Sequence, residues 1–206
     1  MISLVDYGGG NVGSVLKAIE YLGHHAQVVD QPRALGEAEK IILPGQGHFG
    51  AMMNALAERG MVEPLRDIVR SATSLHRTPA RPRLLGICLG LQVLYEASDE
   101  APDVAGLGVL RGRVTRFEGS LKVPHVGWSQ LEIARPSGVL AGIASGSFVY
   151  YCHSYYGPVT QESVAVTCYG QQFAAAVEVG NVWAVQFHPE KSSAVGLRVL
   201  KNFLEA

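Results

Sequence analysis

Several features that would set a chain apart from compact globular proteins are missing from this sequence. No apolar run approaches the ~18 residues that cross a bilayer. Asp6 interrupts the first apolar segment, which argues against the core of a signal peptide. The 17 basic and 18 acidic side chains almost cancel, so the totals point to no polyelectrolyte partner. We therefore expect neither a membrane nor a nucleic acid among the partners of this chain.

Cysteine is also scarce. Cys88, Cys152 and Cys168 are odd in number and lack the spacing of a metal site. Such sparse usage is typical of a reducing compartment, so we expect a cytoplasmic protein. Cys152 and Cys168 fall in strand-like segments, where we expect them to be buried.

The first half of the chain alternates short apolar segments with helical patterns. A chain of 206 residues can form one sizeable core, and we expect a single domain over residues 1–206. Strands are predicted over Met1–Val5, Ala26–Val29, Lys40–Leu43 and the segment that ends at Cys88. Helices are predicted over Asn11–Leu22, Phe49–Glu58, Met61–Ser71 and Leu89–Ala97. This alternation favours an α/β fold with a doubly wound, mostly parallel sheet.

The pattern changes after about Arg111. Strand-like segments with Gly and Pro between them follow at Val114–Phe117, Leu121–Val123, Phe148–Cys152, Ser163–Tyr169, Phe173–Val179 and Val182–Phe187. They predict antiparallel strands added to the parallel half. A last helix is expected over Ser193–Leu204. Thr73–Arg83 has prolines, basic residues and no apolar period, and it is predicted to be an exposed surface loop.

The most informative stretch is Gly86-Ile87-Cys88-Leu89-Gly90. Its spacing is that of the G-x-S-x-G nucleophile elbow with sulfur in place of oxygen. A turn this tight brings backbone against backbone on both sides of the apex, where only glycine lacks a clashing Cβ. The apex side chain then lies at the positive end of the following helix, which favours a thiolate. Cys88 is therefore a candidate nucleophile, and a small buried core residue is the alternative.

A candidate base stands near the C-terminus, in His188-Pro189-Glu190. The proline disfavours helix at His188, so this segment is expected to be extended, with His188 and Glu190 on one face. A histidine beside a nucleophile moves its proton, and a carboxylate behind it fixes the ring. An unrelated surface pair is the alternative for an isolated His-x-Glu. Together with the elbow, the pair predicts a Cys88, His188 and Glu190 triad.

Acyl chemistry also needs backbone donors for the oxyanion that develops. The amide of Leu89 follows the nucleophile and is one candidate. Pro44-Gly45-Gln46-Gly47 closes a neighbouring strand and can turn the amide of Gln46 or Gly47 toward the same point. An ordinary Pro-Gly turn is the alternative.

The segment from Gly8 to Gly13 supports a hypothesis of a different class. It matches G-x-G-x-x-G between a strand and a helix, and Asp30 ends the next strand, as in dinucleotide-binding proteins. However, Asp6 would set a carboxylate near the pyrophosphate. This hypothesis also leaves the elbow and the His188 segment unexplained.

Taken together, these motifs resemble the class I (triad) glutamine amidotransferases, whose fold is flavodoxin-like. The resemblance rests on Pro44-Gly45-x-Gly47, Gly86-Ile87-Cys88-Leu89-Gly90-Leu91-Gln92 and His188-Pro189-Glu190 in that order, and it covers nearly the whole chain. Within the family, the chain most resembles the glutaminase subunit of imidazole glycerol phosphate synthase of histidine biosynthesis. This narrower resemblance rests on Asp6-Tyr7-Gly8, Gly10-Asn11, Pro124-His125-Val126-Gly127-Trp128, His153-Ser154-Tyr155-Tyr156 and His188-Pro189-Glu190-Lys191-Ser192-Ser193.

The resemblance implies a glutaminase that forms a thioester on Cys88 and requires no metal or organic cofactor. L-glutamine is the implied substrate, held by Gly45, Gln92, Ser154 and Tyr155. Gln46 stands where many relatives carry valine. We expect the Pro44–Gly47 loop to be the part that moves when the enzyme is activated. Because of Gln46, we expect it to switch differently from the loops of those relatives.

The resemblance also implies a partner, a (β/α)8-barrel synthase subunit that receives the ammonia within a heterodimer. Asn11, Trp128, Tyr150 and Lys191 are implied to face it. Two alternative functions remain open. Within the family, the chain could be the glutaminase of pyridoxal 5'-phosphate synthesis, whose partner is also a barrel. It could also be an inactive scaffold that only docks a partner.

Overall fold

A central sheet of eight strands organises the molecule. The computed structural model describes residues 1–70 and 82–206. The strand order is β2-β1-β3-β4-β13-β12-β11-β8. The strands are β1 (Ile2–Val5), β2 (Ala26–Val29), β3 (Lys40–Gly45), β4 (Arg83–Cys88), β8 (Glu132–Ile133), β11 (Ser163–Tyr169), β12 (Gln171–Val179) and β13 (Val182–Val185). Neighbours from β2 to β13 are parallel, and those from β13 to β8 are antiparallel. The predicted doubly wound sheet with added antiparallel strands is confirmed.

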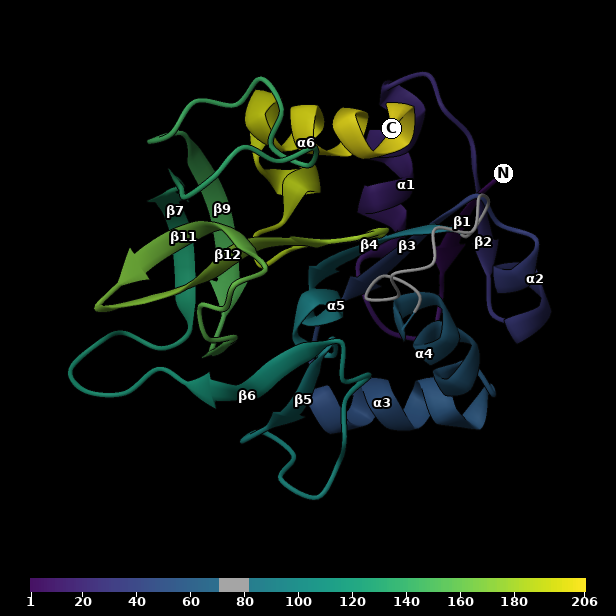
Figure 1. The fold of residues 1–206 in the computed structure, drawn as a ribbon, viewed down its shortest axis with the longest axis horizontal. Coiled ribbons are helices and arrows are strands. Elements are labelled where there is room, and N and C mark those ends of the chain that lie inside the picture. Colours follow the sequence, from purple (N-terminus) through teal and green to yellow (C-terminus); the bar gives the residue numbers. More distant parts are fainter. Residues whose placement is uncertain (71–81) are drawn as a thin grey trace.

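Helices cover both faces of the parallel strands. Figure 1 shows α1 and α6 on one side of the sheet and α3, α4 and α5 on the other. The helices are α1 (Val12–Tyr21), α2 (Pro32–Gly36), α3 (Phe49–Glu58), α4 (Val62–Arg70), α5 (Leu89–Gln92) and α6 (Ser193–Glu205), with a 3₁₀ turn η2 at Pro189–Lys191. Side chains alternate along β3, so Ile41 and Leu43 join the core beneath α3 and α4 while Ile42 joins the core beneath α1 and α6. This two-sided burial is why the parallel strands are almost entirely apolar.

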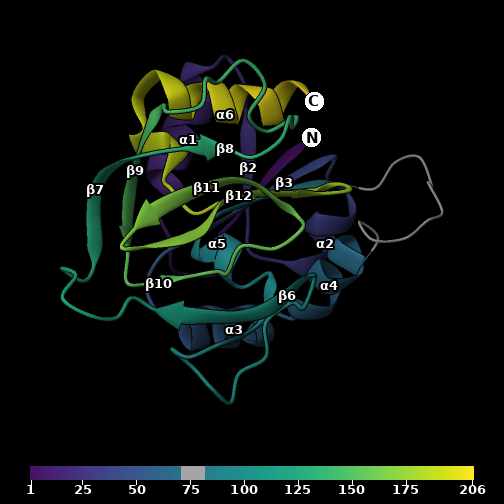
Figure 2. The same ribbon diagram turned by 60° about the vertical axis from the view of Figure 1, so that its left-hand side comes forward.

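Two smaller sheets flank the carboxyl ends of these strands. One has the order β10-β6-β5, and the other is the antiparallel ribbon β7–β9. Their bounds are β5 (Tyr95–Ser98), β6 (Leu110–Arg116), β7 (His125–Gln130), β9 (Phe148–His153) and β10 (Tyr155–Tyr156). Figure 2 shows the ribbon standing at the end of the molecule farthest from α2.

The predicted helix over Leu89–Ala97 is wrong in its second half. Helix α5 ends at Gln92, and Tyr95–Ser98 forms β5. The carbonyls of residues 93–96 accept hydrogen bonds from the backbone N–H groups of residues 106–110 instead of from residues one turn ahead. Tyr95 is fully buried, and its hydroxyl donates to the carbonyl of Pro158. Tertiary pairing therefore overrides the local helical pattern.

The strand predicted over Leu121–Val123 is also wrong, because the strand β7 begins two residues later, at His125. The carbonyl of Lys122 accepts a hydrogen bond from the Tyr169 hydroxyl at 2.7 Å instead of from a neighbouring strand. Pro124 has no N–H to offer to a ladder.

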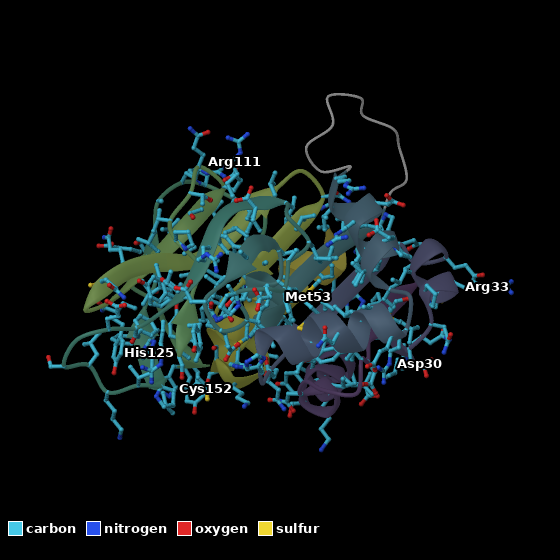
Figure 3. All side chains as sticks on the ribbon, turned by 90° about the horizontal axis from the view of Figure 1, so that it is seen from below. Asp30, Arg33, Met53, Arg111, His125 and Cys152 are labelled. Carbon is cyan, nitrogen blue, oxygen red and sulfur yellow. The ribbon has the colours of Figure 1, made fainter. Side chains whose placement is uncertain are left out.

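Cys152 and Cys168 are exposed, which corrects the prediction that they are buried. Tyr151 and His153 point inward from β9, so Cys152 between them points outward. Figure 3 shows Cys152 and His125 at the side of the molecule opposite Asp30 and Arg33.

Two further expectations concern surface segments. Residues 73–81 of the loop predicted over Thr73–Arg83 lie outside the described residues, and Arg83 itself begins β4. Within residues 1–70 and 82–206, no helix is long and apolar enough to cross a membrane.

Candidate active site

The predicted elbow is present at the junction of β4 and α5. Cys88 has φ 54° and ψ −106°, a strained backbone conformation for a residue other than glycine. A Cβ on Gly86 would lie 2.6 Å from the carbonyl oxygen of Gly90, and a Cβ on Gly90 would lie 2.0 Å from that of Leu43. The glycines therefore allow the close approach that turns Cys88 out of the strand. Its side chain is only 4% exposed but lines a cleft.

His188 and Glu190 meet as the sequence predicts. The Nδ1–H of His188 donates to Oε1 of Glu190 at 2.9 Å, and the ring also interacts with the side chain of Cys88. His188 has an extended backbone, as expected, but Glu190 lies in the 3₁₀ turn η2 rather than in an extended segment. Asn11 also donates to Oε1 of Glu190, at 3.2 Å. The structure thus brings all three triad residues together.

The surroundings of His188 favour its protonated, positively charged form. Burial by itself would lower the pKa of His188, but its contacts with Cys88 and Glu190 outweigh burial and raise this pKa to about 10. Burial would also raise the pKa of Glu190, and the hydrogen bond and positive charge of His188, aided by Asn11, lower it instead. The site can therefore hold a nucleophile, its acid–base partner and an orienting carboxylate ready for acyl transfer.

The predicted oxyanion loop, Pro44–Gly47, borders the cleft. Gln46, Gly47 and Leu89 all line the cleft, as the sequence predicts. The N–H of Gln46, however, donates to the hydroxyl of Tyr7 at 3.2 Å, and that hydroxyl donates back to the Gln46 carbonyl at 3.3 Å. Gly47 has φ +97°, a conformation open to glycine. In this conformation the amide of Gln46 is committed to Tyr7.

Three of the four predicted substrate-binding residues line the same cleft: Gln92, Ser154 and Tyr155. Gly45, the fourth, packs closely against the backbone of α5, since a Cβ there would lie 2.6 Å from the amide nitrogen of Gly90. The carboxylate of Glu100 also lines the cleft, and no sequence motif indicated it. Its Oε2 accepts the N–H of Phe49 at 2.7 Å, which fixes the side chain in place.

A chain of amide groups that the sequence did not predict underlies the cleft. The Nε2 of Gln92 donates to the carbonyl of Tyr155 at 2.7 Å and to Oε1 of Gln186 at 3.1 Å. The Nε2 of Gln186 lies 3.6 Å from Sγ of Cys88 and donates to it. The position of Gln186, two residues before His188 in an extended segment, was the signal that could have indicated it.

The glycine-rich loop offers no good place for a pyrophosphate. Asp6 and the loop from Gly8 to Gly13 line one depression together. The Oδ1 of Asp6 accepts the N–H of Gly8 at 2.8 Å, so one loop amide is occupied by a carboxylate. This arrangement disfavours the dinucleotide-binding hypothesis.

The four residues predicted to face a partner lie around the turn η2 and the ribbon β7–β9, where the backbone of Tyr150 is hydrogen-bonded to His188 and Ser192. Trp128 on β7 pairs with Tyr150 on β9, with ring centroids 6.0 Å apart, and Trp128 is 49% exposed. Asn11 lies beside the triad, because its side chain donates a hydrogen bond to Glu190. Lys191 is exposed and ends the turn η2 that contains Glu190.

The family model described as glutamine amidotransferase class-I matches residues 3–206. The imidazole glycerol phosphate synthase subunit HisH of Syntrophotalea carbinolica is 47% identical over 98% of this chain and 98% of its own length. The subunit of the same name from Moorella thermoacetica is 44% identical over 99% of this chain and 94% of its own length.

Solved structures agree on the fold. A crystal structure of a glutamine amidotransferase superposes with a TM-score of 0.75 at 22% identity and covers 100% of this chain and 98% of that one. The structure of PurLQS from Thermotoga maritima superposes with a TM-score of 0.71 at 19% identity, over 99% and 97% of the two chains. The chain therefore belongs to the glutamine amidotransferase class-I family and is an enzyme of the HisH type within it.

Proposed function

We propose that Cys88, His188 and Glu190 hydrolyse the side-chain amide of glutamine to glutamate and ammonia. The observation that carries this proposal is that His188 interacts with both Cys88 and Glu190. The sulfur of Cys88 attacks the amide carbon, and a C–S bond forms. The tetrahedral intermediate collapses as His188 gives its Nε2 proton to the leaving nitrogen, and the C–N bond breaks.

The second half of the reaction returns the enzyme to its starting state. Water attacks the thioester carbon while the neutral His188 accepts one of its protons. The C–S bond then breaks and leaves glutamate and the Cys88 thiolate beside the imidazolium. Glu190 holds the ring so that Nε2 faces the sulfur throughout.

The walls of the cleft suit the other end of glutamine. Glu100 offers a carboxylate oxygen to the α-ammonium group, with its other oxygen held by Phe49. The hydrogens of the Gln92 amide point at protein carbonyls, so its Oε1 is the atom left to accept from the substrate. Ser154 and Tyr155 also line the cleft, and their backbone N–H groups are the donors that we propose for the α-carboxylate.

The oxyanion is stabilised by the amides of Leu89 and of the Gln46–Gly47 segment. Because the N–H of Gln46 is bonded to Tyr7, this peptide must turn before it can donate to the oxyanion. We expect slow glutamate release from the resting enzyme and a faster rate when a partner turns the Pro44–Gly47 loop.

The partner that we propose is a barrel-fold synthase subunit, which takes up ammonia before water protonates it. The relatives of this chain share the name of a subunit of imidazole glycerol phosphate synthase. This shared name supports a barrel-fold partner, and it favours histidine biosynthesis over pyridoxal 5'-phosphate synthesis. Val126, Trp128 and Phe148 give the ribbon β7–β9 an apolar surface of the kind that marks protein interfaces. Pro124 and Cys152, at the edges of this ribbon, also line the cleft, so the partner would sit where ammonia leaves.

A reducing compartment fits the described cysteines, all of which are free and two of which are exposed. We therefore place the reaction in the cytoplasm.

The proposal is tested by measuring glutamate release with and without a candidate barrel subunit bound to its own ligand. We expect release that rises when the liganded subunit is added and that is abolished in Cys88→Ala. A Cys168→Ala variant is the control, because this thiol is exposed and is not part of the cleft lining. Release that persists in Cys88→Ala would refute the catalytic assignment.

A further inference from the structure

The side chain of Gln186 donates a hydrogen bond to the sulfur of Cys88. The amide nitrogen of Gln186 lies 3.6 Å from Sγ, at the carboxyl end of β13, the strand next to β4 in the sheet. Both side chains are buried, Gln186 completely and Cys88 to all but 4% of its surface. From this contact, and resting on the proposed function, we infer that Gln186 is a further catalytic residue whose N–H group holds the Cys88 thiolate.

The orientation of the Gln186 amide follows from its neighbours. The carbonyl of Tyr155 can only accept, so the Gln92 atom 2.7 Å away is its nitrogen. The same nitrogen lies 3.1 Å from the Gln186 side chain, which must present its oxygen there. The nitrogen of Gln186 is therefore the atom that faces Sγ. A donor, and not a second acceptor, is aimed at the nucleophile.

The chain of donors is anchored at both ends. The Nδ1 of His153 lies 2.8 Å from the same Tyr155 carbonyl and supports it from the other side. The backbone N–H of Gln186 donates to the carbonyl of Ala175 on β12 at 2.9 Å. Gln92 is only 3% exposed, so water competes poorly for these groups. In such surroundings a correctly aimed donor interacts strongly with a charged acceptor.

Gln186 and His188 then act differently on the same sulfur. His188 can give up its proton, as acyl transfer requires. The amide of Gln186 cannot, so it stabilises the negative charge without neutralising it. This stabilisation is present in the resting thiolate, weakens when the sulfur becomes a neutral thioester, and returns as the C–S bond breaks. Gln186 thus assists the departure of the thiolate in the second half of the reaction.

The alternative is that Gln186 only fills space and joins buried polar groups. Alkylation of Cys88 by iodoacetamide separates the two roles, because it reports the thiolate and needs neither glutamine nor a partner. The full chain is alkylated across a pH series, and modification is followed on the peptide that contains Cys88. The variants are Gln186→Met, which keeps the volume without the donor, and Gln186→Glu, which adds a buried negative charge. Asn202→Leu is the matched control, since it removes an amide donor bonded to the carbonyls of Val139 and Ala141, outside the cleft.

For Gln186→Met we expect the pH midpoint of alkylation to rise by about one unit, the size expected when a charge-assisted hydrogen bond is lost. We expect a larger rise for Gln186→Glu and no change for Asn202→Leu. An unchanged midpoint in a folded Gln186→Met variant would overturn the inference. Unchanged alkylation together with normal partner-stimulated glutamate release would overturn only the role of Gln186 and would leave the proposed function standing. A raised midpoint without glutamate release under any condition would overturn the proposed function and leave the contact intact.

A second measurement does not depend on the folding of a Gln186 variant. In the ¹⁵N-labelled chain, we expect Cys88→Ala to shift the side-chain amide signals of Gln186 and to leave those of Asn202 in place. Unmoved Gln186 signals would contradict the contact.

Discussion

The hydroxyl of Tyr7 and the backbone of Gln46 are joined twice, with N···O of 3.2 Å from the Gln46 amide and O···O of 3.3 Å to the Gln46 carbonyl. Tyr7 is only 5% exposed, and burial raises the pKa of its hydroxyl, which stays protonated and able to donate. This contact fixes the peptide that is proposed to stabilise the oxyanion. It therefore links the resting conformation of the loop to a single side chain.

Removing the Tyr7 hydroxyl should free the oxyanion loop. We expect Tyr7→Phe to raise glutamate release by the isolated chain about two- to tenfold, the effect of losing a hydrogen bond that contributes about 0.5–1.5 kcal/mol. The gain on adding the partner should shrink accordingly. Tyr21→Phe is the control, since Tyr21 is 78% exposed on α1. A rate that falls in Tyr7→Phe would show that the hydroxyl serves the active loop instead.

The pKa of His188 should depend on Cys88. In the wild-type chain its imidazole is expected to titrate near pH 10, followed by NMR of ¹⁵N-labelled histidine. Cys88→Ala removes one of the two interactions that raise this pKa and leaves burial and Glu190, so we expect the pKa to fall by about 1–3 units. Cys152→Ala should leave it unchanged, and an unchanged pKa in Cys88→Ala would contradict the ion pair.

The same shift sets a pH dependence of stability. The pKa of His188 is about 10 in the folded chain against an ordinary value of 6.5. Protonation of this ring therefore stabilises the fold fully below about pH 6.5, and this stabilisation is lost as the pH rises through about 10. Urea unfolding of the wild type and of Cys88→Ala should show a smaller loss in the variant between these values. Equal losses would argue against the linkage.

The carboxylate of Glu190 should matter through its charge. Glu190→Gln preserves shape but removes the charge that helps to keep His188 protonated, so we expect glutamate release to fall by roughly 10²–10⁴-fold. The exposed Glu205 is paired with Lys201 at 3.7 Å and is not part of the cleft lining, which makes Glu205→Gln a suitable control. A Glu190→Gln rate within a factor of two of the wild type would exclude the orienting role.

The glycines of the elbow should tolerate no side chain. A Cβ on Gly90 would lie 2.0 Å from the backbone oxygen of Leu43, so we expect Gly90→Ala to lower the free energy of unfolding by about 3 kcal/mol or more. Gly13 in α1 has open space around its Cβ position, and Gly13→Ala should raise this free energy by about 0.5–1 kcal/mol. Urea denaturation measures both, and a stable Gly90→Ala variant would contradict the close approach.

Local steric rules explain why the elbow and the triad could be predicted from the sequence. The glycines around Cys88 are required by contacts within a few residues, and Pro189 restricts His188 directly. The end of α5 at Gln92 could not be predicted, because residues 93–96 bond to a segment ten or more residues ahead. The exposure of Cys152 was missed, although its inward-facing neighbours Tyr151 and His153 carry the alternation of a half-exposed strand.

The missed site residues differ in kind. Tyr7 and Gln186 act through contacts with chain segments far away in the sequence, so their types alone carry no signal. Glu100 lies beyond β5, where the helical expectation had placed no cleft. Single-domain organisation over residues 1–206 stays a prediction.

The most direct test of the account is a competition among the three thiols for a glutamine-mimicking electrophile at neutral pH, with each modified peptide identified by mass spectrometry. Cys152 and Cys168 are exposed while Cys88 is 4% exposed, so solvent accessibility alone would favour modification of Cys152 and Cys168. The account predicts that Cys88 is modified first, and that His188→Ala removes this preference. Modification of Cys152 or Cys168 ahead of Cys88 in the wild-type chain would contradict it.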